Sequence, residues 1–356
     1  MIISLLDLIR DLNSDDEKTR AFAAEDIAYE GLVEGIGPLV KRLNEEPSRF
    51  VREVIVNSLK MLNGPVLAES VIPLLRSDDA YIRNAAIDIL SNQRDATGQS
   101  LVKLLHDRDK DVRKFALDVL FQLNDYYSAD IIAAALDDTD INNVITAVEY
   151  LGRLEASAHA AKISDVFQKT SNLLLRCTCL EALSVIGNEQ TLACVDQVYS
   201  DYCSISPLEQ YSYLKLVASK GQERHLPFVI SLIENKGTAM HKEIINAIEG
   251  ILSRMNWSII PVELVCAIET LLESKINDIN KYELLLLLGE YKNDDIYRIL
   301  LKYLEPANPI VCMGAVEGLG MYRQKQAIPI LADLKSLITD EEVLETIDRS
   351  IEQLSR

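Results

Sequence analysis

Carboxylate side chains recur at a nearly constant spacing along the 356-residue chain. Each lies five positions after an arginine, or after the residue that replaces this arginine. The members of this acidic row are Glu25, Asp88, Asp118, Glu149, Glu181, Glu317 and, in a less regular segment, Glu249, while Asn57 is the exception. Carboxylates that repeat at one interval can bind the basic groups of a partner. Alternatively, they only solvate an exposed helix face.

The residue types that catalysis needs are not grouped in the sequence. The four histidines form no His-x-x-x-His pair, and none is followed by a glutamate: His106, His159, His225 and His241. Gly-rich phosphate-binding loops and a Gly-x-Ser-x-Gly motif are absent as well. Carboxylates alone do not make an active site. We therefore favour a protein without catalytic activity, and we predict neither a metal nor another cofactor.

The six cysteines lie within apolar helical patterns and lack the paired spacing of zinc ligands. They are Cys177, Cys179, Cys194, Cys203, Cys266 and Cys312. Cys177 and Cys179 are the only close pair, and residues two apart on a helix point to nearly opposite faces. We expect these cysteines to act as small buried hydrophobic side chains.

Arginines recur with a period near 30 residues and form what we call the arginine ladder. Its members are Arg20, Arg52, Arg83, Arg113 and, two periods later, Arg176. An aspartate lies four residues before the arginine in three repeats, at Asp16, Asp79 and Asp109, and Ser48 and Asn172 hold the same place. Such residues at the start of a helix accept hydrogen bonds from free backbone N–H groups. We interpret the aspartates as helix caps and the arginines as side chains that form bonds between repeats.

The elements that must position these side chains are pairs of amphipathic helices. The clearest copy runs from Asp109 to Leu120. A single hairpin cannot bury its apolar face alone, so a period near 30 with two helices per unit predicts a stacked helical solenoid. Apolar residues make up 48% of the chain and aromatic residues only 6%, which suits packed helices.

The predicted fold class is all-α, an α-α superhelix of about eleven helical hairpins. We expect a single domain over residues 1–356. Regular repeats span residues 1–187 and 294–335, divergent repeats span 188–293, and a charged hairpin at 326–356 closes the array.

The formal net charge of −19 limits the kinds of partner. It disfavours nucleic acids and anionic membranes, because both carry phosphate groups that this surface would repel. It would steer a basic protein towards the chain, or it only keeps the chain soluble. The first ten residues lack a basic leader, and no apolar run reaches the ~18 residues of a membrane span. We therefore expect a cytoplasmic protein.

The repeats resemble the HEAT-repeat family, particularly the bacterial short repeats named after phycobilisome lyases. Units of that type look like an Ile-Pro-x-Leu first helix followed by Asp-x-x-Val-Arg-x-x-Ala-x-Glu-Ala-Leu-Gly, which is similar to Ile328-Pro329-Ile330-Leu331 and to the stretch that starts at Asp109. The resemblance covers most of residues 1–187 and returns at 294–335. It implies a right-handed superhelix whose second helices line the concave side.

The family that these repeats resemble includes scaffolds, adaptors, bilin-lyase subunits and a few enzymes. The His-Glu pattern of deoxyhypusine hydroxylases is missing, and the acidic composition departs from the basic groove of HEAT-like DNA glycosylases. We therefore expect a protein-binding scaffold or adaptor whose acidic concave surface holds a basic segment of its partner. The alternative is an E/F-type bilin lyase or chromophore chaperone, in which a tetrapyrrole would contact Tyr126, Tyr127, Tyr150, Cys177 and Cys179.

Overall fold

The computed structural model describes residues 4–93, 98–124, 127–199, 201–202, 205–235, 239–255 and 257–356. Within these residues every regular element is a helix. The described residues contain 22 α-helices that pair in chain order into eleven hairpins, which confirms the predicted all-α solenoid. Tyr126 and Cys203 lie outside the described residues.

Contacts divide the chain into two compact units, Met1–Val166 and Phe167–Arg356. The single domain over residues 1–356 stays a prediction.

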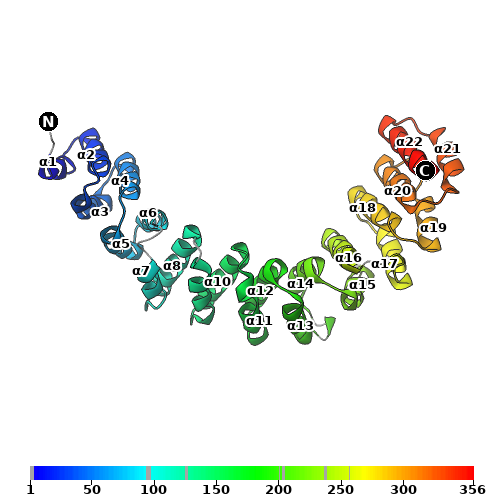
Figure 1. Cartoon of the computed structure of the whole chain (residues 1–356), viewed down its shortest axis with the longest axis horizontal. Coiled ribbons are helices and arrows are strands. Elements are labelled where there is room, and N and C mark those ends of the chain that lie inside the picture. Colours follow the sequence, from blue (N-terminus) through cyan, green and yellow to red (C-terminus); the bar gives the residue numbers. More distant parts are fainter. Residues whose placement is uncertain are drawn as a thin grey trace. The chain divides into compact units, whose positions relative to one another are not determined.

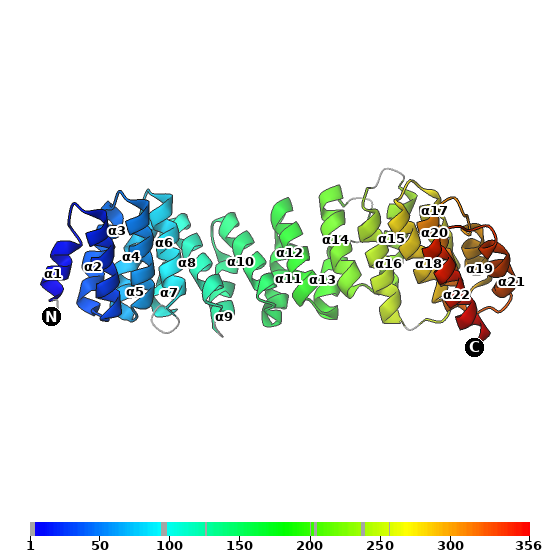
Figure 2. The same cartoon turned by 90° about the horizontal axis from the view of Figure 1, so that it is seen from above.

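The first unit consists of hairpins whose second helices pack side by side (Figure 2). The first helices are α1 (Leu5–Asp11), α3 (Ile36–Glu45), α5 (Pro65–Val71), α7 (Gly98–Leu104) and α9 (Ser128–Ile132). The second helices are α2 (Glu17–Tyr29), α4 (Arg49–Met61), α6 (Ala80–Ser91), α8 (Lys110–Leu123) and α10 (Ile141–Arg153). Short 3-10 helices extend several first helices: η1 (Val33–Gly35), η2 (Ile72–Arg76), η3 (Ala133–Asp137) and η4 (Ser157–His159). Helix α11 (Ala160–Lys169) runs across the boundary between the units.

The second unit continues the same plan, with first and second helices in two layers (Figure 1). Its second helices are α12 (Leu173–Ile186), α14 (Pro207–Lys220), α16 (His241–Met255), α18 (Asp278–Gly289), α20 (Pro309–Tyr322) and α22 (Glu341–Ser355). Its first helices are α13 (Glu189–Val198), α15 (Leu226–Glu234), α17 (Val262–Glu273), α19 (Asp294–Lys302) and α21 (Ala327–Lys335), with η6 (Glu223–His225) before α15. The divergent segment 188–293 therefore forms ordinary hairpins.

Both layers contribute to the core at helical spacing. In α8, Val112, Ala116 and Leu120 lie four residues apart and are all buried. This spacing places them on one face of the helix, where they contact the neighbouring hairpins. The opposite face of each second helix remains at the surface, and we call it the second-helix face.

Candidate partner-binding face

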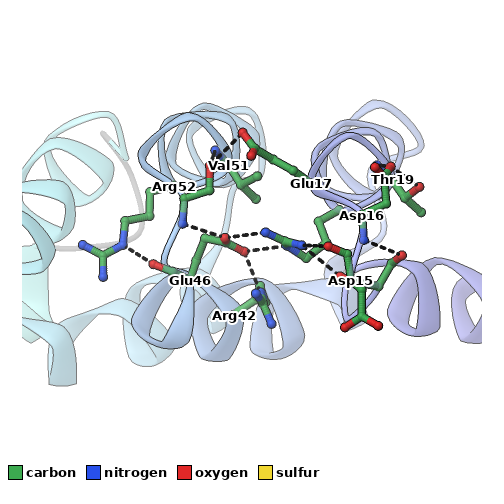
Figure 3. A network of polar contacts seen from close by, with 11 residues as sticks. Asp15, Asp16, Glu17, Thr19, Arg42, Glu46, Val51 and Arg52 are labelled. Atoms are coloured by element: carbon green, nitrogen blue, oxygen red, sulfur yellow. Dashed lines mark hydrogen bonds and ion pairs between the residues drawn. The ribbon is translucent and has the colours of Figure 1, made fainter.

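Two members of the arginine ladder, Arg20 and Arg113, join consecutive hairpins through buried charge pairs. Arg20 donates two hydrogen bonds to Glu46 of the next hairpin, from Nε to Oε2 at 2.9 Å and from Nη2 to Oε1 at 2.8 Å (Figure 3). Its Nη1 also donates to the backbone oxygens of Ser14 and Asp15. Each arginine of this kind therefore ties its own interhelical turn to the following repeat.

Arg113 repeats this geometry four hairpins into the chain. Its Nε and Nη2 donate to the two carboxylate oxygens of Asp138, both at 2.7 Å, and Nη1 donates to the backbone oxygen of Asp107. A planar guanidinium matches a carboxylate in this two-bond arrangement, which a lysine cannot reproduce.

The other arginines of the ladder use different partners. Arg52 donates to Asp79 at 3.0 Å, and Arg176 donates to Glu209 at 2.5 Å. Arg83 donates to backbone oxygens of its own turn, and its guanidinium lies 5.7 Å from the ring centre of Phe115 in the next hairpin.

The predicted caps lie at the first turns of second helices. Asp16, Asp79 and Asp109 accept hydrogen bonds from the backbone N–H groups of Thr19, Tyr81 and Asp111, at 2.8, 2.8 and 2.9 Å. Ser48 and Asn172 cap α4 and α12 in the same way. These bonds satisfy N–H groups that have no partner within their helix.

Sequence reasoning missed a second capping position, which lies six residues before the ladder arginine, or before Val144 in the repeat without this arginine. The side chain at this position accepts a hydrogen bond from the N–H of the cap residue in six repeats, at Ser14, Glu46, Ser77, Asp107, Asp138 and Thr170. The recurring signal was a short polar or acidic side chain two residues before each cap. Glu46 and Asp138 also accept hydrogen bonds from the arginine of the preceding hairpin.

Glu46 is fully buried, yet it is a charged group. Burial by itself raises the pKa of this carboxyl, but hydrogen bonds from Arg20, Arg42 and the Ser48 amide lower the pKa to about 2. The three donors thus favour the charged form more than burial disfavours it.

Several members of the acidic row are paired with basic groups. In the first unit Asp88 accepts from Lys60 at 3.0 Å, and Glu149 lies 3.3 Å from Arg153. Asp118 accepts from Lys114 at 3.0 Å and from the Tyr150 hydroxyl at 2.6 Å, whereas Glu25 is exposed without a bond to any described residue. In the second unit Glu181 accepts from Lys215 at 3.2 Å.

These pairs reduce the negative charge that the row presents. The pairs of Lys60 and Lys215 could not be read from the sequence, because these lysines lie about one repeat away from their carboxylates. Lys114 and Arg153 lie four residues from their carboxylates on the same helix. Pairs of this exposure contribute only about 0–1 kcal/mol, so a partner's basic group could replace the lysine.

The remaining two members of the row lie in grooves on the second-helix face of the second unit. Glu249 lines a groove of about 550 Å³ between α14 and α16, together with Glu243 and Asn246. Glu249 has no hydrogen bond or ion pair to the residues that the structure describes. The basic side chains of this groove are Lys215, which pairs with Glu181, and Arg254, which donates to four backbone oxygens at the end of α14.

Glu317 lines a groove of about 440 Å³ formed by α18, α20 and α22. Two further carboxylates, Glu342 and Glu345, lie in the same groove. Its apolar surface comes from Met313, from Ile279, which is 61% exposed, and from Ile310, which is 42% exposed. The groove therefore combines exposed aliphatic surface with acidic groups.

Within this groove Glu317 is held in place by two neighbours. The Tyr282 hydroxyl donates to Glu317 at 2.6 Å, and this hydrogen bond, together with burial, raises the pKa of Tyr282 to about 12. The Arg349 guanidinium lies 3.9 Å from Glu317. Glu342 and Glu345 form no side-chain bond within the described part of the chain and remain free to meet a ligand.

The cysteines divide into different environments. Cys177, Cys179 and Cys312 are buried as expected, and burial raises the pKa of the Cys179 thiol to about 12. The prediction was wrong for Cys266, which is exposed because its face of α17 lies on a groove rather than on a neighbouring helix.

The residues named for a tetrapyrrole surface do not form a site within either unit. Tyr127 is exposed, while Tyr150 is stacked on Phe121 and bonded to Asp118. Cys177 and Cys179 are buried in α12 of the other unit. Among the described residues no group of three or more His, Cys, Asp or Glu side chains is arranged to hold a metal ion. None of the helices described is both long and apolar enough to cross a membrane.

Comparison with known proteins identifies the repeat type. A family model described as HEAT repeats matches residues 4–91 and 98–184. No curated protein matches the sequence.

Solved structures of a karyopherin have a similar fold. Kap121p bound to the extreme C-terminus of the protein phosphatase Cdc14p aligns with a TM-score of 0.55 at 14% identity, over 99% of this chain and 46% of that one. A mutant of Kap121p aligns with a TM-score of 0.54 at 14% identity, over 99% and 45%. The chain thus spans less than half the length of this karyopherin. Residues 4–91 and 98–184 therefore match the HEAT-repeat family model, in a chain that has the helical solenoid fold throughout its described residues.

Proposed function

We propose that this chain is a non-catalytic scaffold or adaptor of the cytoplasm that binds a basic segment of a partner protein on its second-helix face. The observation that carries this proposal is the groove of α18, α20 and α22, where Glu317, Glu342 and Glu345 surround exposed aliphatic side chains.

This groove suits lysine and arginine side chains for a physical reason. Both have an aliphatic stem that gains by contact with apolar surface, and a charged head that stays near water and carboxylates. Ile279 and Ile310 would contact the stem, while Glu342 and Glu345 would receive the head. Two unpaired carboxylates also give the groove an attraction for cations before contact is made.

The groove between α14 and α16 offers a second place for a basic side chain in the same unit. Glu243 and Glu249 supply carboxylates there, and Asn246 supplies a neutral donor and acceptor. A partner segment that reached both grooves would bind with higher affinity, because its two weak contacts are linked on one chain.

The fold of the relatives supports binding of an extended segment. Kap121p is described as bound to the extreme C-terminus of another protein, which shows that a solenoid of this fold can hold a chain end. Fold alone does not transfer a function, so the grooves and their charges carry the proposal.

The bilin-lyase alternative is not favoured. Its cysteines are buried, and burial raises the pKa of both thiols, which lowers the fraction of reactive thiolate. The bacterial phycobilisome-lyase type of repeat stays a prediction.

Charge reversal in the grooves tests the proposal. The triple variant E249K/E342K/E345K removes unpaired carboxylates and leaves the Tyr282–Glu317 bond in place. In affinity capture from a native lysate we expect wild type to retain a basic protein that the triple variant loses, with binding at least about tenfold weaker.

The matched control is E30K/E34K/E69K, which changes the net charge equally at exposed sites of the first unit. This control should retain the same protein, and both variants should melt near the wild-type temperature. Equal loss in both variants would show a general charge effect, and full retention by E249K/E342K/E345K would remove the second-helix face as the binding site.

A further inference from the structure

A larger groove lies between two first helices of the second unit, on the layer away from the second-helix face. It measures about 1190 Å³ and runs between α15 and α17. Leu226, Pro227 and Ile230 line it from α15, and Val262 and Ala267 line it from α17. Its surface is mostly apolar, and Val262 is 54% exposed.

Neighbouring seams between first helices are closed by ion pairs. Arg298 and Lys302 of α19 bind Glu269 and Glu273 of α17, with Arg298 and Glu269 3.0 Å apart. In contrast, no hydrogen bond or ion pair joins α15 to α17 within the described residues. The lining of the α15–α17 groove is instead mostly apolar, and the exposure of Val262 shows that part of this apolar surface is open to a ligand.

The rim of the groove is acidic. Glu223, Glu234 and Glu263 are exposed at its edge. Arg224 is the one basic residue among the described residues that line the groove, and it pairs with Asp196 at 2.9 Å, so its charge is already matched. An occupant must then bring apolar side chains for the floor and basic side chains for the rim.

A second copy of this chain fits the groove poorly. Two copies that met here about a twofold axis would bring the same acidic rims together, and each copy has a formal net charge of −19. Like charges across an interface oppose binding.

We propose that the α15–α17 groove binds an amphipathic helix of a partner protein, with Leu or Ile side chains in the groove and Lys or Arg side chains at the rim. Apolar residues at positions i, i+3, i+4 and i+7 form one stripe along such a helix, which is the known way that helices dock in apolar grooves. The α15–α17 groove is separate from the second-helix face. Experiments can therefore contradict one of the two binding proposals without contradicting the other.

The test uses the full-length chain and a synthetic amphipathic peptide with Leu at i, i+3, i+4 and i+7 and Lys on the flanks. A peptide of the same composition in scrambled order is the control. Fluorescence anisotropy measures affinity, and the rate of thiol modification at Cys266 reports on the groove, because Cys266 is exposed and lines it. The variant C266S identifies the fast-reacting thiol.

We expect the amphipathic peptide to bind more tightly than the scrambled one and to slow modification of Cys266. Val262→Asp should weaken binding at least about tenfold, since it places a charge among apolar contacts. Val66→Asp is the matched control at a 48% exposed valine of the first unit and should bind as wild type. E234K/E263K should also weaken binding, whereas E249K/E342K/E345K should leave Cys266 protection unchanged.

Three results would overturn the proposal. The first is no binding, or equal binding of the scrambled peptide. The second is binding that leaves Cys266 unprotected or that Val262→Asp does not weaken. The third is a wild-type dimer in sedimentation that Val262→Asp converts to monomer, which would make a second copy the occupant.

Discussion

Glu46 is charged and fully buried, so its carboxylate needs hydrogen bonds from neighbouring groups to remain stable. Arg20, Arg42 and the Ser48 amide supply four hydrogen bonds to its two oxygens. A buried carboxylate is stable only when its lone pairs are satisfied in this way. The first two hairpins therefore depend on one residue that lies between the helices of the second hairpin.

We predict that Glu46→Gln destabilises the first two hairpins in a pH-dependent way. The folded pKa of about 2 lies below the usual 4.5, so the charged form stabilises the fold above about pH 4.5. This contribution is lost as the pH falls from about 4.5 towards 2. The variant should cost up to about 3 kcal/mol at pH 7 and a little under about half as much at pH 3.

Hydrogen exchange in α2 and α4 measures this effect locally, which suits a repeat protein whose parts can open separately. The exposed Glu53→Gln is the control and should change protection little, because Glu53 pairs only with the exposed Arg49. An equal loss of protection at pH 7 and pH 3 in Glu46→Gln would contradict the assignment.

For these individual residues, the sequence predicted only one of the two partners in each interaction. The spacing of Asp16 and Arg20 marked a cap and a long basic side chain, but not the group that receives the arginine. Glu46 and Asp138 meet their arginines because adjacent hairpins stack with a particular offset, and the offset depends on packing along whole helices. The polar residue two positions before each cap was present in the sequence as a signal.

Close approach between second helices sets the packing of the last hairpins. Gly318 of α20 lies against α18, where a Cβ atom would be 2.7 Å from the Leu285 backbone oxygen and 2.7 Å from Leu300 Cδ2. A contact with backbone cannot be relieved by a change of rotamer. The helices would have to separate.

We predict that Gly318→Ala lowers the stability of the second unit by about 2 kcal/mol, as overpacking typically does. Gly37→Ala is the matched control in α3, where nothing lies within 4 Å of the added carbon. This control should be neutral or stabilising by up to about 1 kcal/mol, because alanine is the better helix former. Thermal melting of both variants measures the difference, and a Gly318→Ala protein as stable as wild type would contradict the close packing.

The helices themselves were largely predictable. The period of the arginines and the apolar spacing predicted a stack of about eleven hairpins, and the described part of the chain contains eleven. The α15–α17 groove was not predictable, because it depends on how two first helices pack against each other in a segment without ladder arginines. The exposure of Cys266 depends on the same packing.

Over the whole chain, the excess of acidic residues is partly neutralised by pairs within each unit. Asp88, Asp118, Glu149 and Glu181 have basic neighbours, and their repeat spacing alone did not indicate this. Among the described residues, Glu25 is unpaired in the first unit, and the unpaired Glu249, Glu342 and Glu345 line grooves of the second unit. Charge of this kind affects association more than fold.

The proposed function is tested most directly by carboxylate footprinting of the full-length chain, free and bound to the basic protein that it captures. Carbodiimide coupling of a neutral amine labels exposed carboxylates, and mass spectrometry locates the label. We predict strong protection of Glu249, Glu342 and Glu345 in the complex, with Glu30, Glu34 and Glu69 labelled as in the free chain. Unchanged labelling of the three groove carboxylates in a saturated complex would contradict binding on the second-helix face.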